Sequence, residues 1–292
     1  MMEEYIKKAD TLIEALPYIA RFKGEMIVVK LGGSVMESEE NLRSILTDIA
    51  FMRIVGMRPI VVHGGGKAIS RGLAKAGIET KFVQGFRVTD EASMKVMEDV
   101  IKNEVNASVV KILREAGVDA QPMYGDNIYF TTRKTGKDSE TGATIDWGYV
   151  GIPMSADTGP VRELLHADTI PVICPVGRGA DGHAYNINAD VAASALAKAL
   201  KPRKLAFVSD VPGLLRDPAD PSSLINTITA EQGQELINQG IAGGGMLPKI
   251  QSCLEALAAG VRKVHLVDGR MPHSLLLEIF TNNGVGTEIV RQ

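Results

Sequence analysis

The chain has 292 residues, which is enough for one large α/β domain or two small ones. Its hydrophobic content of 45% and charged content of 23% exclude a disordered or collagen-like chain. The net charge of −3 excludes binding of nucleic acid or anionic membrane by bulk charge, so any phosphate binding has to be local. Glycine is in excess, with 30 residues, or about 10% against an average usage of roughly 7%.

The cysteines and the N-terminus favour a cytoplasmic protein. Cys174 and Cys253 lie in apolar surroundings without a CxxC partner, which argues against a disulfide framework or a zinc site. The first residues are acidic where a signal peptide is basic, and no apolar run reaches the roughly 18 residues that a membrane span needs. We therefore expect neither a membrane nor a nucleic acid among its partners.

The first third of the chain alternates helices and strands. Apolar residues at steps of three and four predict an amphipathic helix over residues 4–20. An apolar strand over 26–31 ends at Gly32 and Gly33, and a helix over 39–55, a strand over 59–62, a glycine turn and a helix over 67–76 follow. This order predicts βαβ units and a three-layer αβα sandwich around a mostly parallel sheet.

The rest of the chain continues this order after one interruption. A long helix is predicted over 90–116, with Thr89 or Asp90 as its N-cap, and aromatic and β-branched residues predict inserted β-hairpins over 119–152. The remaining predicted elements are strands over 169–174, 204–208, 262–267 and 287–290 and helices over 186–200, 229–239, 247–259 and 273–280. Gly177, Gly179 and Gly182 favour a division into an N-terminal helix (1–24) and two lobes (25–178 and 179–292).

Many glycines gather in three loops with a lysine nearby, at residues 32–33, 64–66 and 243–245. Two of these loops follow parallel strands, where the ligands of α/β sheets bind, and successive glycines let backbone N–H groups converge on an anion. Any one loop taken alone can equally be a tight turn. The chain contains neither GxxxxGK[ST] nor a GxGxxG that opens a helix, which weighs against a P-loop enzyme and a nicotinamide-dependent oxidoreductase.

Seven segments in order resemble motifs of the amino acid kinase family, and most of all those of its N-acetylglutamate kinase branch. They span nearly the whole chain, from Lys30 to about Thr287, and read VVKLGGS (28–34), HGGGK (63–67), GFRVTD (85–90), YNINAD (185–190), SDVPG (209–213), GGGMLPK (243–249) and DGRMPHSLLLE (268–278). The resemblance implies an acyl-amino-acid lobe followed by an ATP lobe. It also implies transfer of the γ-phosphoryl group of ATP to the side-chain carboxylate of N-acetyl-L-glutamate, the second step of arginine biosynthesis.

The resemblance also implies roles for individual residues, with ATP and Mg²⁺ as cofactors and the metal held mainly by phosphates and water. A carboxylate acceptor needs no general base, so cations and N–H donors are the expected catalysts. The catalytic residues would be Lys30, Lys249, Asp190, Gly33 and Gly66. The acceptor would be bound by Gly65, Gly66, Arg87 and Asn186, and the nucleotide by Lys30, Gly32, Gly33, Ser209, Asp210, Gly213, Met246 and Lys249.

Several of these residues have a second interpretation. Lys249 can be a solvated helix lysine, Asp190 can be a first-turn residue that stabilises its own helix, and Arg87 can be a surface charge near a helix cap. Lys30 is different, because a charge at the end of a buried strand is costly without a partner. The segments MYGDN and DWGY within 119–150, and Phe86, depart from the family pattern around the acceptor lobe.

The N-terminal helix carries no catalytic motif. It can pack against its own domain, but arginine-inhibited members of the family have such a helix, which joins dimers into a hexamer as a trimer of dimers. The resemblance therefore predicts L-arginine as an inhibitor, with Lys204, Glu278 and Gly284 at its site, and leaves open a PII-type signalling protein as a partner. The remaining alternatives are a glutamate 5-kinase, a carbamate kinase, an aminoadipate-type kinase, or a catalytically silent sensing module.

Overall fold

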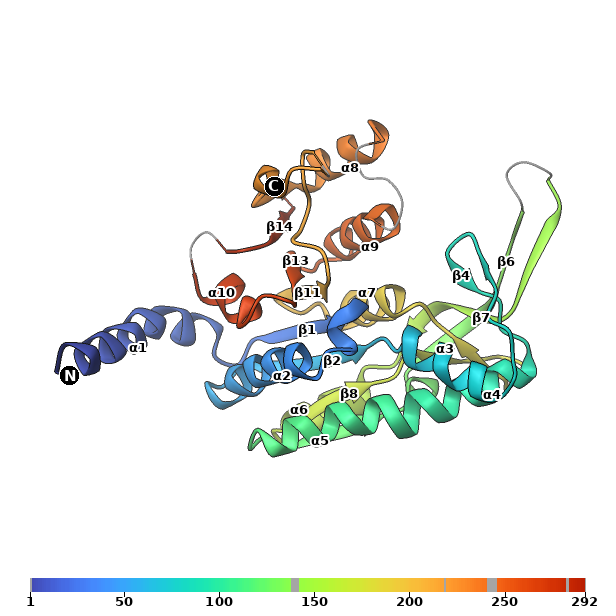
Figure 1. The fold of residues 1–292 in the computed structure, drawn as a ribbon, viewed down its shortest axis with the longest axis horizontal. Helices are drawn as coiled ribbons and strands as arrows, with labels where there is room; N and C mark the ends of the chain where they lie inside the picture. The colour runs from blue at the N-terminus through green and yellow to red at the C-terminus, as the bar shows by residue number, and fades with distance from the viewer. Residues whose placement is uncertain (1, 138–141, 218, 241–245, 282–283, 292) are drawn as a thin grey trace.

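A computed structural model describes residues 2–137, 142–217, 219–240, 246–281 and 284–291. Within these residues, eight strands form one sheet in the order β12-β14-β13-β11-β1-β2-β8-β5 (Figure 1). Neighbouring strands are parallel except for β13 and β14, which confirms the predicted mostly parallel sheet. The strands are β1 (Met26–Leu31), β2 (Arg58–His63), β5 (Ala120–Met123), β8 (Ile170–Ile173), β11 (Lys204–Ser209), β12 (Thr227–Thr229), β13 (Lys263–Asp268) and β14 (Thr287–Val290).

Helices cover both faces of this sheet, because alternate residues of its buried strands point to opposite sides. Val28 belongs to the core under α6 (Gly159–His166), α7 (Ala189–Leu200), α8 (Ala230–Asn238) and α9 (Met246–Ala258). Ile27 and Val29 belong to the opposite core, under α2 (Glu39–Ile54), α5 (Ala107–Glu115) and α10 (Ser274–Phe280). The predicted three-layer sandwich is therefore confirmed.

The predicted long helix over 90–116 contains a change of winding. It consists of α4 (Glu91–Asp99), a π-helical segment η2 (Val100–Asn106) and α5. Asp90 is its N-cap, since the Asp90 carboxylate accepts a 2.7 Å hydrogen bond from the Ser93 backbone N–H. Helix α3 (Gly66–Lys75) packs against the same stretch, and both lie beside the carboxyl end of β2. Short helical turns complete this list: η1 (Gly33–Met36), η3 (Gly125–Asn127) and η4 (Pro221–Ser223).

The predicted hairpins over 119–152 are only partly correct. Residues 120–123 form β5, which pairs with β8 as the edge of the main sheet and not as part of a hairpin. The hairpin proper is β6 (Tyr129–Lys137) with β7 (Thr144–Ala156), and it closes a small barrel with β9 (Val176–Gly179) and β10 (Ala184–Asn186). A second short hairpin, β3 (Phe82–Val83) with β4 (Phe86–Arg87), stands beside it (Figure 1).

Helix α1 (Met2–Phe22) extends away from the sheet (Figure 1). Its last turn packs on the body of the protein, where Tyr18 and Phe22 meet the Phe280 ring edge to face. Its apolar stripe is exposed along the preceding turns, at Tyr5, Ile6, Leu12, Ile13 and Leu16. The interpretation that α1 packs against its own domain therefore holds only for its C-terminal end.

The division into lobes at residue 178 remains a prediction. Residues 178 and 179 lie inside β9, which pairs with β10 and β6, so the boundary cuts through the small barrel. Strand β1 pairs with β2 on one side and with β11 on the other, so the main sheet runs through both proposed lobes.

Candidate active site

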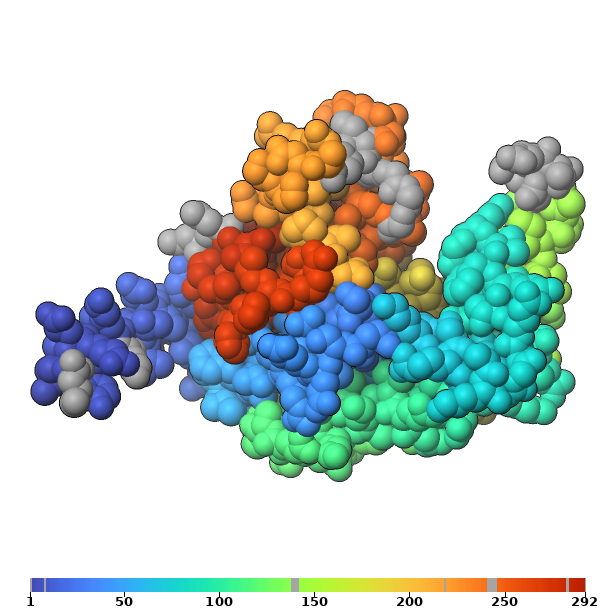
Figure 2. Space-filling model, viewed as in Figure 1, coloured from blue at the N-terminus to red at the C-terminus, as the bar shows by residue number. Residues whose placement is uncertain are grey.

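A cavity of about 420 Å³ opens above the carboxyl ends of β1 and β2. Figure 2 shows the hollow between the C-terminal part of the chain and the arm built from β3, β4, β6 and β7. The predicted residues that line it are Lys30, Gly32, Gly33, Gly65, Gly66, Arg87, Asn186, Asp190 and Asp210. Segments far apart in the sequence thus meet where ligands of parallel sheets bind.

Lys30, Asp190 and Lys249 form one buried cluster. Lys30 follows Val28 by two residues and so faces α7 and α9, where Asp190 and Lys249 lie. The Asp190 carboxylate is 2.8 Å from the ammonium of Lys30 and 3.0 Å from that of Lys249. Because Lys249 is only 8% exposed, it is not a solvated helix lysine.

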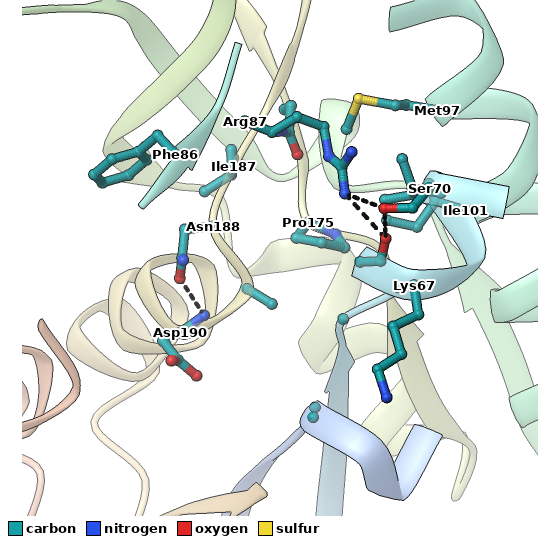
Figure 3. Close-up of a pocket in the computed structure, with 18 of the residues that line it drawn as sticks. Lys67, Ser70, Phe86, Arg87, Met97, Ile101, Pro175, Ile187, Asn188 and Asp190 are labelled. Atoms are coloured by element: carbon teal, nitrogen blue, oxygen red, sulfur yellow. Dashed lines mark hydrogen bonds between the residues drawn. The ribbon is translucent and has the colours of Figure 1, made fainter. Parts of the chain in front are cut away.

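The charges in this cluster stabilise one another against burial. Burial raises the pKa of Asp190, but the two lysines outweigh it and lower this pKa to about 2. Burial lowers the pKa of Lys30, and Lys249 adds to this, although Asp190 opposes both. Asp190 also lies in the first turn of α7, where the Asn188 side chain accepts a 2.8 Å hydrogen bond from the Asp190 backbone N–H (Figure 3). Its second interpretation, as a residue that stabilises its own helix, is therefore compatible with the cluster.

The first glycine loop leaves room for charged side chains. A Cβ atom at Gly32 would collide with Nζ of Lys30, so a larger residue there would force this side chain to shift. Gly33 has φ +68°, and a Cβ atom on it would lie 2.8 Å from a carboxylate oxygen of Asp210. That carboxylate accepts a 3.1 Å hydrogen bond from the backbone N–H of Ser34. Both glycines therefore lie against charged side chains, and Gly33 also has a backbone conformation that favours glycine.

Buried polar groups fix the second glycine loop, residues 64–66, through hydrogen bonds on the side away from the cavity. Gly64 donates its N–H to the carbonyl of Leu31 at 2.7 Å, and its carbonyl lies 2.8 Å from Nδ1 of His63. Asn106, at the end of η2, donates to Nε2 of His63 at 2.9 Å, so the imidazole is neutral with its proton on Nδ1. Burial lowers the pKa of His63 to about 4, although the hydrogen bond to the Gly64 carbonyl acts in the opposite direction and raises it. The ring therefore stays neutral at physiological pH.

This arrangement leaves the N–H groups of the following residues available. Gly65 caps α3 and Gly66 begins it, and the first N–H groups of a helix have no partner within it. A Cβ atom on Gly66 would meet nothing within 4 Å, because the residue borders the open cavity. The loop therefore has the backbone geometry of the anion sites found at helix N-termini.

Arg87 lies in the cavity wall beside the first turns of α3 (Figure 3). Its guanidinium donates to the Gly66 carbonyl at 3.0 Å, to the Ser70 hydroxyl at 2.9 Å and to the Thr80 hydroxyl at 3.0 Å. Burial lowers its pKa, and within the described residues no carboxylate pairs with it. Arg87 is thus buried against α3, not a surface charge, and its partners fix a fork that faces the cavity. Asn186, at the end of β10, lines the same space.

Two of the residues that depart from the family pattern, Phe86 and Trp147, pack on each other beside this cavity. Phe86 lines it and meets the ring of Trp147 at 6.2 Å between ring centres. The indole N–H of Trp147 donates to the Val83 carbonyl at 2.9 Å, which ties β7 to the β3–β4 hairpin. Lys134 lies over both rings. Phe86 and Trp147 therefore connect the two hairpins of the arm.

The other predicted nucleotide residues lie away from this cavity. Ser209 is buried at the end of β11, and Met246 begins α9, where it packs against the core. Gly213, with φ +140°, packs against Thr287, and the next backbone N–H, that of Leu214, donates to the Thr287 hydroxyl at 2.8 Å. The third glycine loop, residues 243–245, lies outside the described residues.

Lys204, Glu278 and Gly284 line a second, smaller cavity of about 130 Å³ beside the last turn of α1. Glu278 accepts bonds from Nδ1 of His265 at 2.7 Å and from the backbone N–H groups of Val285 and Gly286 at 2.8 and 2.9 Å. Burial raises the pKa of Glu278, but these donors outweigh it and hold the pKa below its usual value. Burial lowers the pKa of Lys204 to about 8.

Among the residues that the structure describes, no group of three or more His, Cys, Asp or Glu side chains is placed to hold a metal ion. None of the described helices is both long and apolar enough to span a membrane.

Among the other residues that line the cavity are Ser34, Lys67 and Ser70, to which the sequence assigned no role. Lys67 is part of the HGGGK segment and could have been found from that motif. Ser34 is likewise the last residue of the VVKLGGS segment. Ser70 carries no sequence signal of its own, because its place depends on Arg87, 17 residues further along the chain.

Comparisons with known proteins agree with this geometry. Residues 25–268 match the model of the amino acid kinase family. The chain is 42% identical to the acetylglutamate kinase of Akkermansia muciniphila over 98% of this chain and 97% of the relative. It is 44% identical to the acetylglutamate kinase of Symbiobacterium thermophilum over the full length of both.

Solved structures give the same picture for the fold. N-acetylglutamate synthase from Neisseria gonorrhoeae, complexed with coenzyme A and N-acetyl-glutamate, superimposes with a TM-score of 0.85 at 27% identity, covering 97% of this chain and 63% of the synthase. The same synthase with coenzyme A and L-arginine gives 0.80 at 26% identity, covering 96% and 64%. This chain thus spans less than two thirds of the synthase. From its sheet, its cavity and these matches, the chain belongs to the amino acid kinase family.

Proposed function

We propose that this chain transfers the γ-phosphoryl group of ATP to the side-chain carboxylate of N-acetyl-L-glutamate, in arginine biosynthesis. The observation that carries this proposal is one cavity lined by Lys30 and Asp190, by the Gly64–Gly66 loop and by Arg87, with Lys249 paired to Asp190 behind its wall. Relatives of nearly the same length that are named acetylglutamate kinase support the choice of acceptor.

The chemistry asks for little beyond position and charge. A carboxylate acceptor is already an anion, so the step needs no general base, but two negative groups have to approach each other. Lys30 and Lys249 stabilise the charge on the transferring phosphoryl group, and Asp190 holds both ammonium groups in place. The backbone N–H groups of Gly33 and Gly66 add donors from opposite loops.

The protein binds the acceptor at two places, the α-carboxylate and the side-chain carboxylate that reacts. Arg87 receives the α-carboxylate, because its fork is buried and faces the cavity without an internal carboxylate partner. Asn186 offers an amide beside it, and Gly65 and Gly66 donate their N–H groups to the acceptor.

The nucleotide occupies the side of the cavity toward β11 and α9. Gly32, Gly33 and Asp210 face its phosphates, while Ser209, Gly213 and Met246 belong to the elements around the rest of the nucleotide. Mg²⁺, bound mainly through phosphates and water, would neutralise part of the phosphate charge.

Trapping of the product with hydroxylamine tests the proposal. The full chain with ATP and Mg²⁺ should form hydroxamate with N-acetyl-L-glutamate and far less with free glutamate, carbamate or aminoadipate derivatives. A preference for free glutamate, carbamate or an aminoadipate derivative would instead identify a glutamate 5-kinase, a carbamate kinase or an aminoadipate-type kinase, respectively. Absence of product with every acceptor would identify a silent sensing module instead.

We propose L-arginine as a feedback inhibitor at the second cavity. Glu278 and Glu288 supply carboxylates at its wall, while Arg21 and Phe22 of α1 close one side. A ligand there would contact both α1 and the end of the sheet, which supports a link between inhibition and α1. The synthase of the same fold has been crystallised with L-arginine.

We further propose that the exposed stripe of α1 joins dimers into a hexamer, and a PII-type protein remains a candidate partner of that assembly in the cytoplasm. Deleting residues 1–22 should leave a dimeric kinase without arginine inhibition, measured by light scattering and by hydroxamate formation with added arginine. Leu12→Glu is the matched single change, since Leu12 is 68% exposed on that stripe. A truncated chain that is still hexameric and still inhibited would contradict both parts.

A further inference from the structure

Lys67 is a cation in the cavity wall to which the sequence assigns no role. It lines the same cavity as Lys30, Gly65 and Arg87, and its side chain is exposed there. In the described part of the chain, no carboxylate forms an ion pair with it. Arg71, one turn later on the same helix, does pair with Glu37. Lys67 therefore adds an uncompensated positive charge to the cavity.

The place of Lys67 on its helix is electrostatically unfavourable. It is the second residue of α3, whose first turn contains no acidic residue, and Lys75 lies at the favourable C-terminal end. The N-terminal end of a helix carries a partial positive charge from the helix dipole, so a cation at that end is repelled by it. A residue that breaks this local rule at a ligand cavity is expected to have a functional reason.

The remaining charges of the cavity show what that reason is. Lys30 and Lys249 both bind the Asp190 carboxylate, and Asp210 is held by the N–H of Ser34. This leaves Arg87 and Lys67 as the cavity cations without a carboxylate partner among the described residues. Figure 3 shows them at opposite ends, with the Lys67 side chain directed away from Arg87 and toward η1. Two separated cations match an acceptor with two separated carboxylates.

We propose that Lys67 binds the reacting carboxylate of the acceptor while Arg87 binds the other, an inference that rests on the function proposed above. The carboxylate oxygen forms the new bond to the γ-phosphorus, and the bond from this phosphorus to the bridging oxygen breaks, with its electron pair leaving on ADP. No proton moves in this step, so Lys67 stays protonated and keeps its contact with the oxygen atoms of the acyl phosphate.

Lys67→Met tests the proposal, with Lys75→Met on the same helix as the matched control and Lys67→Arg as the conservative variant. In the hydroxylamine assay, Lys67→Met should lower kcat/KM for N-acetyl-L-glutamate on the order of 10²-fold, while KM for ATP stays within about twofold. Lys67→Arg should recover part of the loss, and Lys75→Met should behave as wild type. The thermal midpoint of Lys67→Met should be equal to or higher than that of wild type, because an unfavourable charge has been removed.

N-acetyl-L-glutamine separates a role of Lys67 in binding from a merely structural one, because it lacks only the charge at the reacting end. Its inhibition constant should change less than about twofold in Lys67→Met, whereas KM for N-acetyl-L-glutamate should rise. An equal loss for both ligands, a rise confined to KM for ATP, or wild-type kinetics in Lys67→Met would each overturn the proposal. Failure of the proposed function is distinguishable, since wild type itself would then form no hydroxamate from N-acetyl-L-glutamate.

Discussion

Asp190→Asn removes the charge of the carboxylate that lies between two buried ammonium groups while keeping its shape. The Asp190 oxygens are 2.8 Å from Lys30 and 3.0 Å from Lys249, and the two lysine side chains are 8% and 10% exposed. Without the carboxylate, two buried cations face each other. The change should therefore destabilise the fold and lower turnover together.

The magnitude follows from the pKa of Asp190. Lowering this pKa from 3.8 to about 2, despite burial, corresponds to stabilisation on the order of 2 kcal/mol at neutral pH. Removing one partner of a buried ion pair costs about 3–5 kcal/mol. Burial lowers the pKa of Lys30 even with Asp190 present, so the charged form of Lys30 destabilises the fold. This cost offsets part of the stabilisation that Asp190 provides. We expect a loss of about 3 kcal/mol, or roughly 6–12 °C in Tm for a chain of this size.

The effect depends on pH in a defined direction. The pKa of Asp190 is lowered on folding, so its stabilisation is complete above about pH 4 and is lost as the pH falls toward 2. The pKa of Lys30 is lowered as well, so its cost is present at neutral pH and disappears as the pH rises toward 10.5. The cost of the charged Lys30 grows when Asp190 is replaced. The difference in the free energy of unfolding between Asp190→Asn and wild type should therefore narrow at low pH, where Asp190 is protonated, and at high pH, where Lys30 is neutral.

Urea unfolding between pH 3 and pH 10, followed by the fluorescence of the single tryptophan, Trp147, measures this difference. Glu91→Gln is the control, since Glu91 forms an exposed ion pair with Lys95 and its loss should produce no measurable change. If Asp190→Asn unfolds at the wild-type urea midpoint at pH 7, the account of the cluster as a mutually stabilised unit is refuted.

Three further changes test the loops and the acceptor side. Arg87→Lys loses the planar fork and should raise KM for the acceptor about 10-fold or more at unchanged KM for ATP in steady-state kinetics; a change in KM for ATP alone would contradict this. Gly33→Ala should raise KM for ATP, whereas Gly77→Ala, with a similar φ of +72° in open space, should lower only the Tm; equal kinetics in both variants would contradict the close packing on Asp210. Asn106→Leu leaves His63 and a carbonyl unpaired, and should cost about 2 kcal/mol in urea unfolding and reduce kcat; wild-type values would refute the bracing of the glycine loop.

The sequence predicted the local elements well where a few neighbouring residues decide them. The cap at Asp90, the apolar strands at 26–31 and 204–208 and the helices between them depend on spacing and capping within one or two turns. The π-helical segment was not predicted, because an α-helix and an α-helix with one wider turn have nearly the same apolar pattern. Residues 120–123 were misassigned, since an edge strand and a hairpin strand have the same composition.

The sequence by itself determined the layered α/β fold, the glycine loops and, through its motifs, the identity of the candidate residues. It did not determine that Lys30, Asp190 and Lys249 share one buried cluster, because these residues come from β1, α7 and α9 and meet only when β1 lies between β2 and β11. The pairing of charges, and therefore which cations remain free for a ligand, is a property of distances across the sheet. Local sequence patterns contain no such distances, and for this reason only the tertiary structure could separate Lys67 from the other lysines of the chain.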